Sequence, residues 1–360
     1  MQLPDSPYLE IIIVFIFLLL VALFLSLILR RRKKTPEDNA YQKALEHLAD
    51  GQLQQALDKF KEAVRQDTGN ISAYLRLGDL LRQQGLIKNA LRIHKELTLR
   101  ENLTREENLK IHESLLRDYE AAGDLQKGIL IARKIMEMNK ADNSWAAEKL
   151  IDLYVRAGNW QEAIDATKKY FKPLSTERKK ELAGYLVSQG LQKLKEGRGK
   201  EGRIKFKEAI KIYPQCKEAY YHLGKSYLEE NRLEDAVRQW RKFCFEVPQE
   251  AHIVFPLLEK ASFEMGKFSD VENLYIELLA LETKNLKTLL ALAEFYIKKG
   301  KLEKALSLLE NADSELKESP EVAAKKVEVL YQMKMFENAS EEALRVLQER
   351  YAGEEQLEKS

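Results

Sequence analysis

The sequence predicts an all-α protein in which one membrane-spanning helix precedes about nine helix-turn-helix units stacked into a superhelical solenoid. Two observations predict this architecture. Residues 11–29 form an apolar run without a single charge, and a small residue returns at intervals of 34 to 39 positions from residue 56 to residue 339. A length of 360 residues would ordinarily suggest two or three domains, but one repeated unit accounts for nearly all of this chain.

The apolar run reads IIIVFIFLLLVALFLSLIL. At about 1.5 Å per residue its nineteen residues are just long enough for a hydrocarbon core of roughly 30 Å. A cleaved signal peptide would carry its cations before the apolar run, whereas here Asp5 and Glu10 precede it. The cations follow it, as Arg30, Arg31, Arg32, Lys33 and Lys34. Because cations stay on the cytoplasmic side, we expect residues 1–10 in the periplasm and the repeats in the cytoplasm.

The remaining boundaries follow from composition. Residues 30–39 form a basic juxtamembrane linker, residues 40–350 the repeat array and residues 351–360 a polar tail. The net charge is +2, and since the five junction cations contribute +5, the rest of the chain sums to −3. This balance argues against a nucleic-acid binder. Two cysteines, Cys216 and Cys244, are too few for a disulfide framework.

The repeat is visible when two segments are compared: AYLRLGDLLRQQGLIKNALRIHKEL from Ala73 and AYYHLGKSYLEENRLEDAVRQWRKF from Ala219. Each places an aromatic residue before Leu-Gly and an alanine twelve residues after the glycine. This pattern resembles the tetratricopeptide repeat. The small residue that opens each second helix recurs along the chain, where two helices cross closely. The column comprises Ala56, Ala90, Gly128, Ala163, Gly202, Ala236, Val271, Ala305 and Ala339.

Other positions support this register. An aromatic residue stands four positions after the column residue at Phe60, Phe206, Trp240 and Tyr275. Two of the steps in the column are longer, at 38 and 39 residues, and we expect the extra residues in polar connections at residues 101–108 and 172–180.

Patterns that carry chemistry are absent from the sequence. The five histidines show no HExxH or similar ligand spacing, the two cysteines have no companions at metal-site spacing, and there is no GxSxG elbow. We therefore expect no catalytic residues, no cofactor and no metal, and interpret the chain as a binder of proteins and not an enzyme.

The binding surface is expected on the concave side of the solenoid, which the first helix of each repeat lines. Exposed aromatic residues and arginines on a rigid wall are common anchors for a docked segment, although the same residues also occur on ordinary soluble surfaces. Counting from the Leu-Gly pair selects Asp79, Arg82, Arg117, Tyr221, Lys225, Tyr296 and Tyr331.

A second resemblance covers residues 66–125. This segment is similar to the corresponding part of the lipopolysaccharide assembly protein B family, with the elements D-T-G, L-G-x-L-x-R-x-x-G, A-x-R-I-H, L-T-x-E and D-Y-x-A-G in the family's order. The order of span, basic junction and repeats is similar as well. The similarity depends most on residues that the repeat itself does not require, namely Asp67, Thr68, Arg92, His94 and Asp118.

The resemblance implies an inner-membrane adaptor that regulates lipopolysaccharide synthesis by bringing the committed deacetylase of lipid A synthesis to a membrane AAA+ protease. Members of the family end in a rubredoxin-like zinc ribbon with two CxxC pairs, and this sequence has no cysteine after Cys244. The alternative is a general membrane-tethered scaffold or assembly chaperone for an envelope complex. The sequence leaves the identity of the partner and the formation of a homo-oligomer open.

Overall fold

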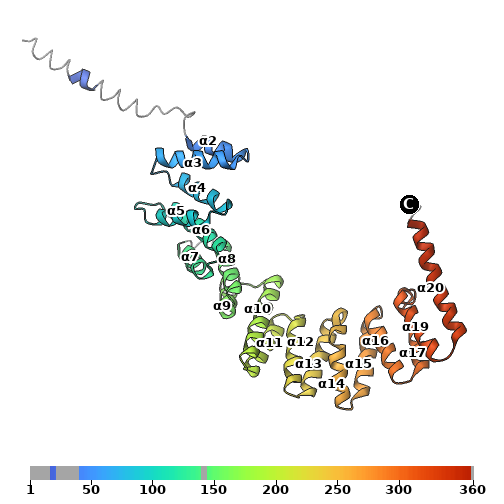
Figure 1. Ribbon diagram of the computed structural model, residues 1–360. Coiled ribbons are helices and arrows are strands. Elements are labelled where there is room, and N and C mark those ends of the chain that lie inside the picture. Colours follow the sequence, from blue (N-terminus) through green and yellow to red (C-terminus); the bar gives the residue numbers. More distant parts are fainter. Residues whose placement is uncertain (1–16, 22–39, 139–143, 358–360) are drawn as a thin grey trace, which may run out of the picture. The chain divides into compact units, whose positions relative to one another are not determined.

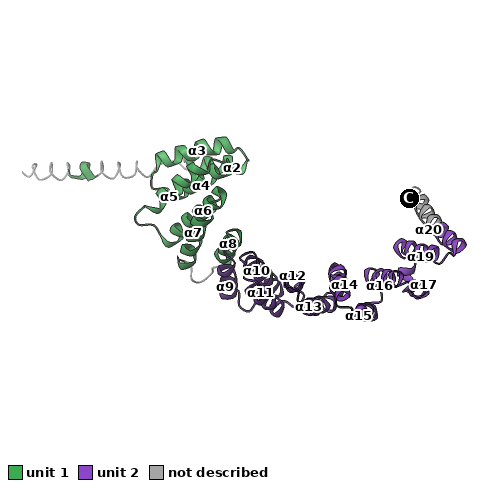
Figure 2. Cartoon of the chain, turned by 60° about the horizontal axis from the view of Figure 1, so that its bottom comes forward, with its two compact units in different colours: residues 1–158 green, residues 159–360 purple. Residues whose placement is uncertain are grey.

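The computed structural model describes residues 17–21, 40–138 and 144–357, and every regular element in these residues is a helix. The chain forms two compact units, Met1–Gly158 and Asn159–Ser360 (Figure 2). Unit 1 contains α2 (Ala40–Ala49), α3 (Leu53–Gln66), α4 (Ile71–Gln83), α5 (Ile87–Thr98), α6 (Arg105–Ala122), α7 (Leu125–Met138) and α8 (Ser144–Arg156) (Figure 1).

Unit 2 continues the same alternation of helices and turns (Figure 1). It contains α9 (Trp160–Tyr170), α10 (Thr176–Lys195), α11 (Gly199–Ile212), α12 (Lys217–Glu229), α13 (Leu233–Glu246), η2 (Pro248–Ile253), α14 (Phe255–Glu264), α15 (Phe268–Leu281), α16 (Leu286–Lys298), α17 (Leu302–Glu310), α18 (Ser314–Lys317), α19 (Pro320–Gln332) and α20 (Phe336–Leu357). Helix α20 extends seven residues into the segment predicted as a polar tail.

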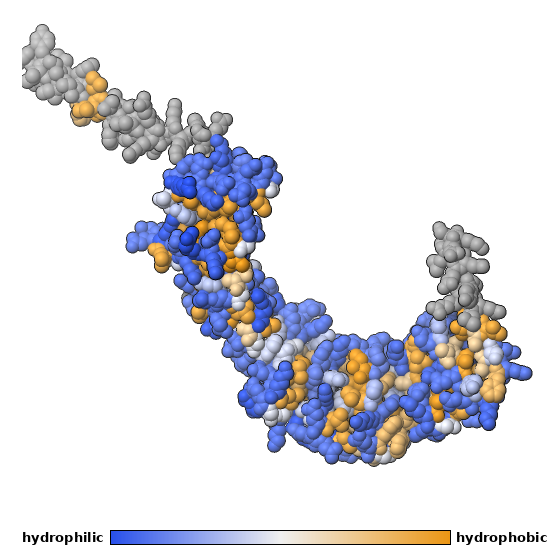
Figure 3. Space-filling view, viewed as in Figure 1, coloured by the Kyte–Doolittle hydropathy of each residue, from blue (hydrophilic) through white to orange (hydrophobic). Residues whose placement is uncertain are grey.

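Consecutive helices pack as hairpins, such as α4 with α5, α10 with α11 and α12 with α13. Tight turns join the two helices of a hairpin. Gly85 and Gly123 sit in these turns with φ values of 77° and 71°, a left-handed conformation in which glycine has no Cβ penalty. Figure 3 shows hydrophilic residues over most of the visible face of both units, interrupted by patches of hydrophobic residues. The predicted all-α repeat architecture is confirmed.

The small-residue column lies where the register places it. Each of its nine members is buried, and each is the fourth residue of its helix. Val271, the largest member, is fully buried on α15. The column therefore marks positions of close helix packing in both units, where a small or medium-sized side chain lets the backbones approach each other.

Four hairpins combine a small residue on one helix with a larger residue sixteen positions away on the other. A Cβ atom added to Gly78, Gly190 or Gly224 would overlap the ring of the residue sixteen positions later: His94, Phe206 and Trp240, respectively. In the hairpin of α6 and α7 the sizes are reversed, with Leu116 on the first helix and Ala132 on the second, both fully buried.

The extra residues of the two long repeats differ from the expectation. Helices α6 and α10 have 18 and 20 residues, against 13 for α4 and α12, so most of each insertion extends a helix. The cause is a strong N-cap placed early. Thr104 forms a capping box with Glu107, and the hydroxyl of Ser175 accepts a hydrogen bond from the backbone N–H of Arg178. The polar connections themselves are shorter than predicted.

The predicted membrane span at residues 11–29 lies outside the described residues except for residues 17–21, which are helical. The N-terminal segment 1–10 and the junction cations Arg30 to Lys34 lie outside them entirely. Among the helices that the structure describes, none combines the length and the apolar character needed to cross a bilayer. The span and its orientation stay predictions.

Candidate functional site

Two adjoining hollows lie on unit 1 and share Glu113 and Arg117 of α6. The first has a volume of about 220 Å³ and is lined by Tyr41, Ser72, Leu75, Arg76, Asp79, Lys110, Glu113, Ser114 and Arg117. The second has a volume of about 330 Å³ and is lined by Leu109, Glu113, Arg117, Ile135, Ser144, Trp145 and Ala146. The first helices α2, α4, α6 and α8 supply most of these residues, as the solenoid geometry predicts.

Arg117 lies where the two hollows meet, and its guanidinium is available to a ligand. Its side chain is 44% exposed, and its ion pair with Glu113 is long, at 3.9 Å. The guanidinium lies 5.5 Å from the centre of the Trp145 ring, within the range of a cation–π interaction. An arginine beside an aromatic ring in an open hollow suits the docking of a protein segment that offers an acidic or carbonyl group.

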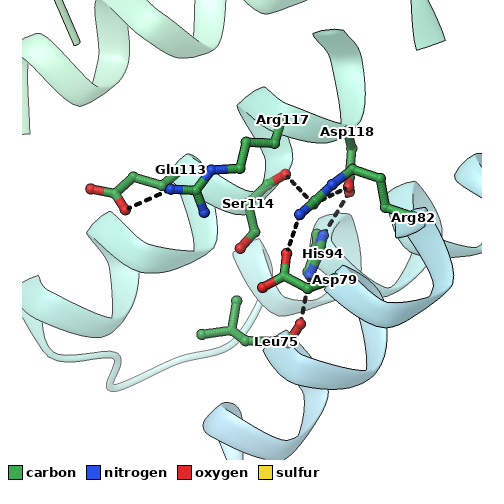
Figure 4. A network of polar contacts seen from close by, with 8 residues as sticks. All are labelled: Leu75, Asp79, Arg82, His94, Glu113, Ser114, Arg117 and Asp118. Carbon is green, nitrogen blue, oxygen red and sulfur yellow. Dashed lines mark hydrogen bonds and ion pairs between the residues drawn. The ribbon is translucent and has the colours of Figure 1, made fainter. Parts of the chain in front are cut away.

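A buried polar network lies beneath this surface and joins α4, α5 and α6 (Figure 4). The Asp118 carboxylate faces His94 Nδ1 at 2.6 Å and accepts a hydrogen bond from Arg82 Nη1 at 2.8 Å. Arg82 Nη2 lies 2.8 Å from Asp79 Oδ1, and Nη1 also reaches the backbone oxygen of Ser114 at 3.4 Å. Asp118 and His94 are completely buried.

Within the network, the positive charge of Arg82 is balanced by the carboxylates of Asp118 and Asp79. Burial alone would lower the pKa of the Arg82 guanidinium, but hydrogen bonds and attraction from Asp118 and Asp79 outweigh burial and raise it. Arg82 therefore stays charged between two carboxylates. Because Asp79 and Ser114 also line the first hollow, the network holds one wall of that hollow in position.

His94 belongs to the structural repeat although the aromatic column did not predict it. It stands four residues after Ala90, where Trp240 stands after Ala236. Trp240 Nε1 donates to the backbone oxygen of Tyr221, and His94 Nε2 faces the equivalent oxygen, that of Leu75, each at 3.3 Å. Histidine takes the place of a core aromatic residue here and uses its second nitrogen to contact Asp118.

The other residues singled out by the second resemblance lie apart from this network. Asp67 and Thr68 form the exposed turn between α3 and α4, where Asp67 Oδ1 accepts from Gly69 N at 2.9 Å and Arg100 Nη1 donates to the Thr68 oxygen at 2.7 Å. Arg92 is exposed on α5. Two of the five residues, His94 and Asp118, are thus brought into direct contact.

The groove residues predicted in unit 2 have varied surroundings. Tyr296 is buried and borders a hollow of about 630 Å³ lined by residues of α15, α16 and α17 and the residues after α17. Tyr221 is half-buried with its ring edge-on to His222, while Lys225 is exposed. Tyr331 is 65% exposed and lies 5.4 Å from the ring of Phe336. The structure does not gather these four side chains into one site.

Sequence reasoning missed Trp145 and Glu113. Trp145 lies in the first turn of α8, outside the aromatic position that precedes Leu-Gly, so the repeat register gave no reason to select it. Within the described ranges, no three His, Cys, Asp or Glu side chains are grouped so that they could hold a metal ion.

Comparisons with known proteins define the class of this protein. Two models described as tetratricopeptide repeat match residues 47–106, 188–242 and 262–326, which together make up half of the chain. The chain therefore belongs to the tetratricopeptide-repeat family.

Among curated proteins the chain is similar to lipopolysaccharide assembly protein B. The Escherichia coli K12 protein is 26% identical over 152 residues, which cover 42% of this chain and 39% of that protein. The Haemophilus influenzae protein of the same name is 24% identical over 225 residues, covering 58% of this chain and 56% of that protein. The chain thus matches about two fifths to somewhat more than half of the length of these relatives.

The chain is also similar to solved structures at lower identity. The structure of Naa15/Naa10 bound to HypK-THB is 13% identical with a TM-score of 0.43, over 88% of this chain and 50% of that one. Yeast Tom70 is 14% identical with a TM-score of 0.35, over 88% of this chain and 70% of that one.

Proposed function

We propose that this protein is a membrane-anchored adaptor whose unit 1 binds an extended segment of a cytoplasmic protein across the two adjoining hollows. The carrying observation is that Arg117, half-exposed and held by only a long ion pair, lies beside Trp145 where the hollows meet. The buried network of Arg82, His94 and Asp118 supports this surface from below. A wall whose half-exposed cation and aromatic ring are already in position lowers the entropic cost of docking.

The similarity to lipopolysaccharide assembly protein B supports a more specific role. In that role the chain regulates lipopolysaccharide synthesis by holding a lipid A biosynthetic deacetylase beside a membrane AAA+ protease. The predicted span at residues 11–29 anchors it in the bacterial inner membrane, with the repeats on the cytoplasmic side. Tethering raises the effective concentration of the bound protein near a membrane partner, which is the physical advantage of an anchored adaptor.

A pull-down from detergent-solubilised membranes tests this role, with the full-length chain as bait. Recovery of the protease and the deacetylase together is expected. Recovery of an envelope complex without them would favour the general scaffold or assembly chaperone and would defeat the adaptor role.

A matched pair of variants tests the surface itself. Arg117→Ala is expected to weaken capture about tenfold, since arginine anchors contribute about 1 to 2 kcal/mol or more at protein interfaces. The control is Arg156→Ala on α8, because Arg156 is 42% exposed and also pairs with a carboxylate four residues earlier, Asp152 at 3.4 Å. Equal capture by both variants would show that the hollows are not the binding surface.

A further inference from the structure

The outward face of α5 carries a stripe of cations that ends in an exposed leucine. Lys88, Arg92, Lys95 and Leu99, hereafter the α5 stripe, are spaced by four, three and four residues. At about 100° per residue they fall within an arc of roughly 60°. All four are exposed, whereas Ala90, His94 and Leu97 face the core.

The cations of the α5 stripe have no carboxylate partner within the part of the chain that the structure describes. Among the described residues, none of the three forms an ion pair with a carboxylate, although Lys95 lies 5.5 Å from the ring centre of Tyr119. The neighbouring helices differ, since Lys61 pairs with Asp58 at 3.2 Å. Hydrogen bonds from Lys127 lower the pKa of Asp124, to which Lys95 adds only a smaller effect.

Leu99 adds an exposed apolar side chain to the cations of the α5 stripe, which distinguishes the stripe from an ordinary solvated helix face. It is 81% exposed, the highest fraction of any large apolar side chain in the described part of the chain. Leu130, which follows the column residue of α7 by two positions as Arg92 follows that of α5, is 62% exposed. Cations beside projecting leucines fit the boundary of a bilayer, where ammonium and guanidinium groups meet phosphates and leucine enters the acyl region.

The length of the chain before α2 permits this contact. Ten residues, 30–39, separate the predicted span from Ala40, and fully extended they reach about 35 Å. Helix α5 is connected to α2 by three packing steps, through α3 and α4. At roughly 8 to 10 Å for each step, α5 lies within reach of the bilayer surface.

We propose that the α5 stripe docks on a surface of anionic phospholipid and holds unit 1 against the membrane, an inference that rests on the membrane anchoring proposed above. Each cation near an anionic leaflet strengthens docking about fivefold, so the three cations together with Leu99 act as a second attachment beside the anchor.

A fluorescent label at Leu99 tests the docking in the full-length chain. The variant Leu99→Cys, labelled with the environment-sensitive dye NBD, is placed in lipid nanodiscs of phosphatidylcholine alone or mixed with phosphatidylglycerol. The native thiols stay unlabelled at neutral pH, because Cys216 and Cys244 are buried and burial raises their pKa values to about 11 and about 12. A blue shift of the dye emission is expected only in discs that contain phosphatidylglycerol.

Two charge-reversal variants separate the stripe from general electrostatics. Lys88→Glu/Lys95→Glu is expected to weaken docking by at least roughly 30-fold and to abolish the shift. The control is Lys200→Glu/Lys207→Glu on α11, because these exposed lysines occupy the same positions relative to the column and Lys207 likewise lies near a tyrosine ring, that of Tyr227 at 5.9 Å. The control is expected to keep the shift.

The outcomes that contradict the proposal are distinct from a failure of the anchor. If the chain enters the discs but the dye at residue 99 stays in a polar environment in both lipids, the docking is wrong while the anchoring stands. Loss of the emission shift in both charge-reversal variants would show that docking depends on the net charge of the chain and not on the α5 stripe. If the chain does not enter the discs, the anchoring is wrong, and the same labelled chain is mixed with preformed vesicles, where an unshifted emission also overturns the docking. Capture of an acidic protein by the stripe without lipid contact would overturn it as well.

Discussion

The carboxylate of Asp118 and the ring of His94 form the most deeply buried polar contact described in unit 1: Oδ2 and Nδ1 are 2.6 Å apart, and neither side chain is exposed. The contact joins the second helix of one hairpin to the first helix of the next. Arg82 reaches the other carboxylate oxygen from α4, so three consecutive helices meet at one group. The candidate binding surface therefore depends on a contact that is itself completely buried.

Removing the shared carboxylate is predicted to loosen all three helices. Asp118→Ala leaves Arg82 and His94 buried without their common partner, which costs about 3 to 5 kcal/mol. Hydrogen exchange measured by mass spectrometry should show faster exchange in α4, α5 and α6. The control is Asp152→Ala, whose carboxylate is 53% exposed and pairs with Arg156, and it should change stability by less than about 1 kcal/mol. Equal effects in the two variants would contradict the role of the network.

Two glycines on first helices are predicted to respond to alanine with opposite signs. Gly78→Ala places a Cβ atom against the ring of His94 and should destabilise unit 1 by about 1 to 3 kcal/mol, the usual cost of overpacking. Gly184 in α10 has open space around its Cβ position and ordinary helical backbone, so Gly184→Ala should stabilise by about 0.5 to 1 kcal/mol. Chemical denaturation checks both, and a stabilising Gly78→Ala would show that the hairpin packing is misassigned.

The sequence predicts the repeat architecture better than it predicts individual contacts between hairpins. Periodicity alone predicted the nine-member column and the hairpin architecture, because a close helix crossing favours small residues and eight of the nine members are alanine or glycine. The pairing of His94 with Asp118 was not predictable in the same way, since the two residues are 24 positions apart and meet across different hairpins. The available signal was a histidine at a position where other repeats have an aromatic residue. A buried imidazole needs a polar partner, but the sequence did not show which residue supplies it.

The hollows were less predictable than the network. Arg117 was selected by its position on the first helix, but so were Tyr296, which is buried, and Asp79, which is bound to Arg82. Whether a groove-facing residue is free depends on the rotamers of its neighbours, both on its own helix, as for Asp79 and Arg82, and in the adjacent hairpin. The repeat pattern contains no information about either. Trp145 escaped for the same reason, since only its distance to Arg117 makes it part of the surface.

The buried thiols predict how unit 2 responds to alkaline pH. Burial raises the pKa of Cys244 to about 12 and that of Cys216 to about 11, above the ordinary value of about 8.5 for a thiol. The folded state then binds these protons more tightly than the unfolded state, so the stability that they contribute is complete below about pH 8.5 and is lost as the pH rises toward about 12.

Denaturation of unit 2 at a series of pH values checks this prediction. The wild-type midpoint should fall as the pH rises above about 9, and it should fall less in Cys244→Ala, where one of the two thiols is absent. Thiol reagents at pH 8 should react only after unfolding. Rapid labelling of the native chain, or the same pH profile in both proteins, would show that the thiols are accessible.

Removal of residues 1–34 tests what the predicted anchor contributes. An untethered fragment, residues 36–360, should fold and bind its cytoplasmic partner through unit 1, yet fail to complement a strain that lacks the protein. The reason is that an adaptor to a membrane partner depends on co-localisation, and avidity gains of roughly 100- to 10,000-fold are lost when the tether is removed. Full complementation by the fragment would defeat the anchored-adaptor proposal.

A chimera with an unrelated span of the same orientation separates two roles of the anchor. Rescue by the chimera is expected if residues 11–29 act as a tether, because unit 1 then returns to the membrane surface with its hollows unchanged. Failure of the chimera, with normal membrane localisation, would assign the span a specific helix contact within the bilayer. Alkaline phosphatase fused after Ser360 supplies the control for orientation. The fusion should be inactive in both the native chain and the chimera, since the enzyme matures only outside the cytoplasm, and activity in either would place the repeats on the opposite side.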